Sequence, residues 1–187
     1  DIAYQGFGAG LYEDAEAVRI FAAQDITMLI SSSFSKSFSL YGERVGALTL
    51  VAGSKDEAGR VLSQLKRVIR TNYSNPPTHG GTIVSSVLNT PELFATWEKE
   101  LAGMRDRIRL MRQQLAEKVK AAGATQDFGF IVKQRGMFSY TGLTSAQVDV
   151  LREQHGIYAV SSGRICVAAL NSGNIDTVAK AIAAVAK

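Results

Sequence analysis

Cysteine and histidine are scarce in this sequence. Its 187 residues include one cysteine, Cys166, and two histidines, His79 and His155. A single cysteine excludes an internal disulfide framework and fits a reducing compartment, for which we expect the cytoplasm. Within the apolar segment 165–169, we expect Cys166 to be a small buried hydrophobic residue. Two scattered histidines are too few for a metal site, so we expect no bound metal.

Long apolar runs are also missing, and the charges nearly balance. No stretch approaches the length of a membrane-spanning helix, so we expect no membrane partner. The 21 basic and 17 acidic residues give a net charge of +4, a mild excess that is weak evidence for nucleic acid, and we expect none. The hydrophobic content of 46% and charged content of 20% are typical of a soluble globular protein. The first residue is Asp1, so we expect a piece of a longer chain.

The most informative stretch is residues 31–46, SSSFSKSFSLYGERVG, with one lysine among six serines. It lies between two apolar runs, residues 26–30 and 45–51, that predict strands. Ligands bind at strand ends in open α/β sheets, and small hydroxyl side chains allow an anionic group to approach closely. Lysine forms Schiff bases, and Arg44 offers a fork of donors that suits phosphate. The competing interpretation is that Lys36 is an ordinary solvated lysine.

The rest of the sequence predicts alternating helices and strands, which is typical of an α/β fold. Capping residues mark three helix starts: Ser54 with Glu57, Thr90 before Pro91, and Thr144 with Gln147. Helices are predicted over residues 13–24, 54–70, 82–88, 91–121 and 144–155, and after Asn174. Further strands are predicted over residues 128–134, 137–140, 157–160 and 165–169. The arginines of the long helix are expected on a solvated face; they are Arg105, Arg107, Arg109 and Arg112.

The lysine stretch resembles the cofactor-lysine motif of the class I aminotransferases, in the branch that acts on aspartate and aromatic amino acids. These enzymes use pyridoxal 5'-phosphate. The resemblance covers the whole sequence but only the C-terminal part of the family chain. It implies a fold-type I pyridoxal-phosphate transferase, with the C-terminal portion of the large cofactor-binding domain at residues 1–90. Residues 91–187 are then the long connecting helix and the small C-terminal α/β domain.

The resemblance also implies which residues hold the cofactor. Lys36 holds its aldehyde and later moves a proton. Asp1 corresponds to the acid that keeps the pyridine nitrogen protonated, and Tyr4 to the tyrosine that bonds the phenolic oxygen. The implied phosphate ligands are Ser33, Ser35 and Arg44. Without the lysine motif, Asp1 and Tyr4 read simply as a chain end and a core tyrosine.

Four further residues resemble the family's substrate contacts. Arg164, in SSGRICVAALN, matches the arginine that binds the substrate α-carboxylate in a bidentate manner. Arg70, in IRTNYSNPP, matches the arginine that receives the distal carboxylate across a dimer interface, with Ser74 nearby. Phe138, in RGMFSYTGL, matches a residue lining the substrate pocket. The resemblance therefore implies a homodimer; taken alone, Arg70 suits a helix C-terminus and Arg164 an exposed surface.

The expected function is a transaminase that moves an amino group between tyrosine, phenylalanine or aspartate and 2-oxoglutarate by a ping-pong mechanism. One alternative is a lyase or decarboxylase on the same fold, against which Arg70 argues because it recognises a second carboxylate. A second alternative is an aminotransferase-like ligand-sensing module without catalysis, as occurs in DNA-binding regulators. A third is an incomplete fragment that is inactive alone.

Overall fold

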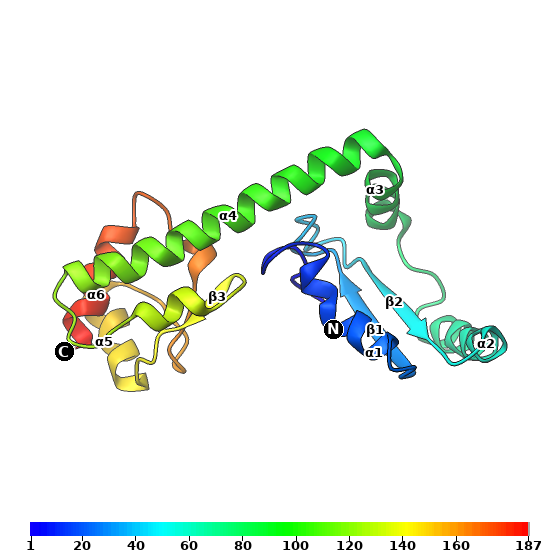
Figure 1. The fold of residues 1–187 in the computed structure, drawn as a ribbon, viewed down its shortest axis with the longest axis horizontal. Coiled ribbons are helices and arrows are strands. Elements are labelled where there is room, and N and C mark those ends of the chain that lie inside the picture. Colours follow the sequence, from blue (N-terminus) through cyan, green and yellow to red (C-terminus); the bar gives the residue numbers. More distant parts are fainter. Residues whose placement is uncertain (187) are drawn as a thin grey trace. The chain divides into compact units, whose positions relative to one another are not determined.

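The computed structural model describes residues 1–186 and contains two compact units, Asp1–Leu101 and Ala102 onward. Figure 1 labels their helices and strands. The first unit contains the 3-10 turn Glu13–Ala15, α1 Glu16–Ala22, β1 Met28–Ser33, β2 Gly46–Val51, α2 Lys55–Asn72, α3 Thr78–Asn89 and the start of α4 Pro91–Ala121. The second contains the rest of α4, the 3-10 turn Gly129–Lys133, β3 Phe138–Tyr140, α5 Ser145–His155, β4 Arg164–Cys166, the 3-10 turn Val167–Ala169 and α6 Ile175–Val185.

The sheet of the first unit is an antiparallel pair, β1 with β2, in which Ser33 lies opposite Gly46. The start of the chain adds to the outer side of β1, because Ile2 forms a parallel bridge with Ser32. The Ile2 amide donates to the Ser31 carbonyl at 2.7 Å. This bridge sets Asp1 beside the C-terminal end of β1, next to the lysine stretch.

The helix α2 is amphipathic but packs little against its own unit. The Ser54 hydroxyl accepts the Glu57 amide at 3.1 Å, as predicted for an N-cap. The Glu57 carboxylate accepts the Gly53 amide at 3.0 Å, so the predicted reciprocal bond to Ser54 is replaced by one to the preceding residue. None of the residues of α2 is buried, and Leu62 and Val68 are 50% and 62% exposed. Its apolar stripe therefore lacks a covering partner within the described residues.

The second unit has a dense apolar core, drawn from the inward faces of α4, α5 and α6. Leu115, Leu151 and Ile182 are each at most 1% exposed. Helix α5 has the predicted boundaries: Thr144 and Gln147 form a complete capping box, and Gly156 ends the helix in the left-handed conformation. Strands β3 and β4 form an antiparallel pair with Ser139 opposite Ile165.

Three predicted strands of the second unit are wrong or too long. Residues 129–133 form a 3-10 turn, because Phe128 and Ile131, three positions apart, are both buried on one side of it. Residues 157–160 pair with no strand in the described chain; the Ile157 amide instead closes α5 onto Leu151. Strand β4 stops at Cys166, since Val167 begins another 3-10 turn.

Membrane-spanning helices and metal-binding clusters are two features that the sequence does not lead us to expect. In the described residues, every helix is too short or too polar to cross a bilayer. The same residues contain no cluster of three or more histidine, cysteine, aspartate or glutamate side chains placed to bind a metal ion.

Candidate active site

Lys36 lies in a tight turn directly after β1. The Phe38 amide donates to the Phe34 carbonyl and the Ser39 amide to the Lys36 carbonyl, both at 3.2 Å. The serines on either side of the lysine, Ser35 and Ser37, are only 5% and 9% exposed. Their small side chains let the turn fold back on the strand while the longer lysine side chain remains half-buried.

The Lys36 ammonium lies near two tyrosine rings. Its Nζ is 4.7 Å from the ring centre of Tyr4 and 5.8 Å from that of Tyr41. Aromatic faces attract a cation without forming an ion pair. Among residues 1–186, no carboxylate lies within ion-pair distance of Lys36. The amine is therefore positioned by aromatic rings and is not held in an ion pair. Tyr41 lies within the lysine motif, but the sequence alone predicts no role for it.

Ser33 and Arg44 lie on the two sides of this turn. The Ser33 hydroxyl accepts the Ser35 amide at 3.3 Å, so these two predicted phosphate ligands are neighbours. The Arg44 Nη1 donates to the Tyr41 carbonyl at 2.8 Å. Arg44 has φ +53°, a left-handed conformation that costs energy for a residue with a side chain. Strain of this kind often occurs at functional sites, which supports a role for Arg44.

Helix α4 packs against the turn that carries Lys36. The Trp97 indole N–H donates to the Ser37 carbonyl at 2.8 Å, and the Phe38 ring stacks on Trp97 with centres 4.6 Å apart. This partly buried contact restrains the residue directly after Lys36. The sequence alone predicts no role for Trp97 at the lysine turn.

Asp14 organises the loop that carries Tyr4. Its carboxylate accepts backbone N–H groups from Gly6, Gly8 and Ala9, at 2.8, 2.9 and 2.8 Å. Gly6 has φ +92°, and a β-carbon there would lie 2.5 Å from Leu101, so this position requires glycine. The glycine-rich residues 6–10 therefore form a loop folded around one carboxylate.

Arg70 and Ser74 lie together at the C-terminal end of α2. The Arg70 Nη1 donates to the Ser74 hydroxyl, and Ser74 has φ +69°. In the described chain neither residue forms a hydrogen bond or ion pair with Lys36. The structure thus joins these two predicted residues to each other and not to the lysine.

The predicted residues Arg164 and Phe138 meet on the β3–β4 pair of the second unit. The Arg164 guanidinium lies 4.9 Å from the Phe138 ring centre. Phe138 is opposite Cys166, and Tyr140 is opposite Arg164, so these four side chains share one face of the pair. The prediction that Cys166 is buried is wrong: it is exposed, because it alternates with the inward-facing Ile165.

The opposite face of the β3–β4 pair meets an arginine of α4, which corrects a second expectation. Arg112 is 3% exposed, and its Nε donates to the buried Ser139 hydroxyl at 3.0 Å. Burial, and then the nearby charge of Arg109, lower the pKa of Arg112. Arg107 donates to the carbonyls of Ala168 and Leu170. Arg112 is therefore packed against the small sheet and does not lie on a solvated face, whereas Arg107 is exposed, as expected, although its guanidinium donates to these two carbonyls.

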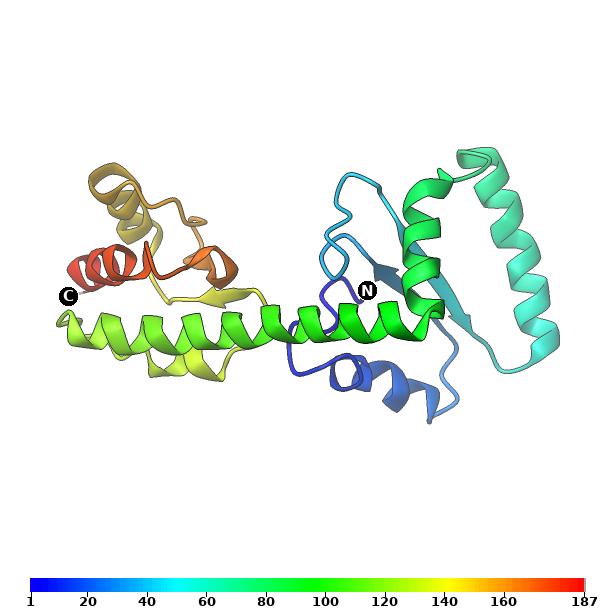
Figure 2. The same ribbon diagram turned by 90° about the horizontal axis from the view of Figure 1, so that it is seen from above.

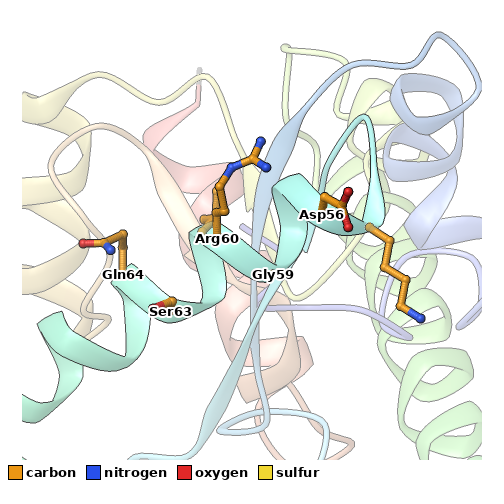
Figure 3. A pocket seen from close by; sticks show the side chains of 7 residues that line it. Asp56, Gly59, Arg60, Ser63 and Gln64 are labelled. Atoms are coloured by element: carbon orange, nitrogen blue, oxygen red, sulfur yellow. The ribbon is translucent and has the colours of Figure 1, made fainter.

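A hollow on the surface of α2 contains none of the predicted site residues. Figure 3 labels five of the residues at its wall: Asp56, Gly59, Arg60, Ser63 and Gln64. Because all its lining residues come from one helix, it is an open surface depression and lacks the converging groups of an active site.

Comparison with known proteins identifies the family. Residues 1–182 match the family model "Aminotransferase class I and II". Aspartate aminotransferase of Pseudomonas aeruginosa is 66% identical over 97% of this chain, and aromatic-amino-acid aminotransferase of Escherichia coli is 54% identical over 99%. The crystal structure of an aromatic-amino-acid aminotransferase from Burkholderia pseudomallei, described as covalently bound to pyridoxal phosphate, superposes with a TM-score of 0.98 at 71% identity over the full chain.

The chain therefore belongs to the class I and II aminotransferase family, and its expected fold-type I architecture is confirmed. It spans only 46% of the Pseudomonas protein and 47% of both the Escherichia protein and the Burkholderia chain. About half of each relative thus has no counterpart in these residues.

Proposed function

We propose that this chain is the C-terminal part of a pyridoxal-phosphate-dependent aminotransferase. The enzyme would move an amino group between an aromatic or dicarboxylic amino acid and 2-oxoglutarate by a ping-pong mechanism. The observation that carries the proposal is the position of Lys36, near two tyrosine rings and directly after Ser33 and Ser35 in the turn that follows β1. The names of the relatives support transamination with aspartate, tyrosine and other aromatic donors.

The side chains near Lys36 fit the proposed cofactor. A free amine suits its aldehyde, while the Ser33 and Ser35 hydroxyls and the Arg44 guanidinium are donors suited to its phosphate. When bound, pyridoxal phosphate supplies an electron-withdrawing ring that makes the α-proton of an amino acid acidic. The Burkholderia protein, whose crystal structure is covalently bound to pyridoxal phosphate, supports the same cofactor for this chain.

Each residue then has a role at a stated atom. With the cofactor bound, the Lys36 Nζ would accept the substrate α-proton as a general base and would later donate it as a general acid. The Asp1 carboxylate keeps a proton on the cofactor ring nitrogen, because an ion pair stabilises the charged ring. The Tyr4 hydroxyl donates to the phenolic oxygen of the cofactor.

We propose that the β3–β4 face binds the substrate α-carboxylate. The Arg164 guanidinium provides two parallel donors for it, and the Phe138 ring beneath supports the guanidinium plane. Arg70 and Ser74 would bind the distal carboxylate in the site of a second subunit. Their separation from the Lys36 contacts and the exposed stripe of α2 both support a homodimer.

The proposal includes domain boundaries and a compartment. Residues 1–90 would belong to the large cofactor-binding domain, and residues 91–187 to the long helix and small domain. The start of α4 at Pro91 supports this division. Relatives include a protein named as cytoplasmic, from rice, and one named as mitochondrial, from Dictyostelium discoideum. We propose the cytoplasm, because the single cysteine fits a reducing compartment.

Three other functions are less well supported. A lyase, a decarboxylase or a non-catalytic ligand sensor has no counterpart among the relatives named here, which are aminotransferases. The third alternative, a fragment that is inactive alone, applies to the 187 residues expressed by themselves, so the experiments below use the full-length protein.

The direct test is reduction of the full-length protein with borohydride after incubation with pyridoxal phosphate. Reduction fixes the lysine–cofactor bond, so an intact mass should show one adduct per chain, mapped by peptide analysis to Lys36. The Lys36→Arg variant keeps the positive charge and should carry none, whereas Lys66→Arg, on the exposed surface of α2, should still carry one. An adduct at another lysine, or none in the unsubstituted protein, contradicts the proposal.

A further inference from the structure

The β3–β4 pair presents Arg164 and Phe138 on one face and rests on α4 arginines at its other face and its end. Ser139 and Ile165 point away from the exposed face, and the Ser139 side chain is 2% exposed. Figure 2 shows β3 running alongside the C-terminal half of α4. The two strands are only three residues each, so backbone pairing alone gives them little rigidity.

Arg112 forms hydrogen bonds to β3 and to the residue two positions before it. Its Nε donates to the Ser139 hydroxyl at 3.0 Å, and its Nη2 donates to the Gly136 carbonyl just before the strand. The two contacts are three residues apart and bracket Phe138. A planar guanidinium with both contacts made allows the strand little freedom to slide or twist.

Arg107 supports the segment after β4 in a similar way. Its two terminal nitrogens donate to the carbonyls of Ala168, at 3.2 Å, and Leu170. These carbonyls belong to the turn that follows directly after Arg164, Ile165 and Cys166. The two arginines are five positions apart on α4, and between them they anchor both sides of the small sheet to one rigid helix.

The partners of Arg112 explain why the contact is specific. Within residues 1–186, its hydrogen-bond partners are a hydroxyl and a carbonyl, and no carboxylate lies within ion-pair distance. Burying an arginine in this way is costly, and replacing buried charged groups by well-packed apolar residues is often neutral or stabilising. A guanidinium at this position fixes the strand through hydrogen bonds, which an apolar side chain could not form.

We propose that Arg112 and Arg107 are positioning residues that hold the β3–β4 pair so that Arg164 meets the substrate α-carboxylate. This inference rests on the proposed function of Arg164. It predicts an effect on substrate binding that is separate from cofactor binding, since the hydrogen bonds of both arginines go to the β3–β4 pair and the segments next to it.

The test compares Arg112→Met, Arg112→Lys, Ser139→Ala and Arg107→Met in the full-length protein loaded with pyridoxal phosphate. Lys120→Met, an exposed substitution on the same helix, is the control. Binding of maleate, a dicarboxylate that is not turned over, is measured by calorimetry, and KM and kcat are measured with aspartate. Cofactor affinity is measured by equilibrium dialysis.

We expect Arg112→Met to weaken maleate binding and raise KM about 10-fold, the scale of a small misplacement of a substrate-holding group. Arg112→Lys should recover little, because an ammonium does not reproduce the fork. Cofactor affinity should change less than twofold in every variant, and Lys120→Met should leave all values unchanged. Should Arg112→Met fail to fold, Ser139→Ala and Arg107→Met carry the test, each with an expected threefold or larger rise in KM.

The possible failures are distinguishable. If the unsubstituted protein neither binds maleate nor transaminates aspartate, the proposed function is wrong. If it does both, and the variants lose thermal stability with unchanged KM and maleate affinity, the arginines are structural only and the positioning role is overturned. A parallel loss of cofactor affinity would overturn it as well, because the effect would then not be specific to the β3–β4 pair.

Discussion

The Nζ of Lys36 lies 4.7 Å from the ring centre of Tyr4, over the loop that Asp14 folds. Two segments that are distant in the sequence, the first residues and the turn after β1, thus meet at one amine. The bridge between Ile2 and Ser32 brings the same segments together through the backbone. The relationship is consistent with our proposal that Asp1, Tyr4, Ser33 and Lys36 bind the same cofactor, and it provides the first prediction.

Removing the Tyr4 ring should slow capture of the cofactor. Tyr4→Leu loses the aromatic face that positions the Lys36 ammonium, a contact worth about 0.5–1 kcal/mol at a partly exposed site, so the rate should fall about two- to fivefold. Tyr4→Phe keeps the ring and should lose less of the rate, because it removes only the hydroxyl that we propose contacts the cofactor. The measurement is the absorbance change after pyridoxal phosphate is added to cofactor-free full-length protein. Equal rates in Tyr4→Leu and the unsubstituted protein would show that the ring does not position the amine.

Replacing Arg44 should separate its backbone strain from its side-chain chemistry. At φ +53°, Arg44→Gly relieves the strain and Arg44→Ala retains it, so the glycine variant should be more stable by about 1 kcal/mol. Both variants lose the guanidinium and should lose cofactor affinity equally. Urea unfolding and equilibrium dialysis measure the two effects.

The matched control for Arg44 is its neighbour Glu43, which is not among the residues with positive φ. There the order should reverse, with Glu43→Ala more stable than Glu43→Gly. If alanine is the more stable substitution at both positions, the left-handed conformation of Arg44 carries no measurable cost.

The sequence predicted the elements whose signals are local. Helix α4 and helix α5 start and end where Pro91, Thr144, Gln147 and Gly156 indicate, because caps act within one turn of the backbone. The lysine motif likewise identified the turn after β1, since strand, serines and lysine are contiguous.

What the sequence did not predict depends on distant partners. Arg112 looks like any surface arginine of a long helix until Ser139 and Gly136 are folded beneath it. Residues 157–160 have strand composition, but Ile157 is used to close α5, leaving Tyr158 83% exposed. Cysteine in an apolar segment is usually buried, but Cys166 is exposed because successive residues of β4 point to opposite faces and Ile165 points inward. Each case requires knowledge of which residues lie opposite.

Asp14 should be important for stability although it lies outside the proposed chemistry. Asp14→Ala removes the carboxylate that accepts hydrogen bonds from three backbone N–H groups and should cost about 3 kcal/mol in the free energy of unfolding. Asp14→Asn keeps one oxygen and should cost less. Glu16→Ala, an exposed acidic residue two positions later, should change the value by less than about 0.5 kcal/mol. Equal effects at Asp14 and Glu16 in urea unfolding would refute this.

The last prediction concerns acid and the ion pair between Lys118 of α4 and Asp176 of α6, which are 2.5 Å apart. The hydrogen bond from Lys118, and then its charge, hold the pKa of Asp176 below its ordinary value. A carboxyl whose pKa is lowered by folding contributes stability above its unfolded pKa and loses that contribution as the pH falls through the folded pKa. Asp176→Asn should therefore be less stable than the unsubstituted protein at neutral pH, by a small amount because the pair is solvent-exposed.

The difference between the two proteins should vanish in acid, below the folded pKa of Asp176. Urea unfolding at a series of pH values measures it, with Asp149→Asn as a comparison, since the Asp149 carboxylate pairs with Arg152 within the single helix α5. Salt should reduce the Asp176 effect at neutral pH, because exposed charges are screened. A difference that persists unchanged at low pH would mean that Asp176→Asn acts through packing of α6 and not through the charge of its carboxylate.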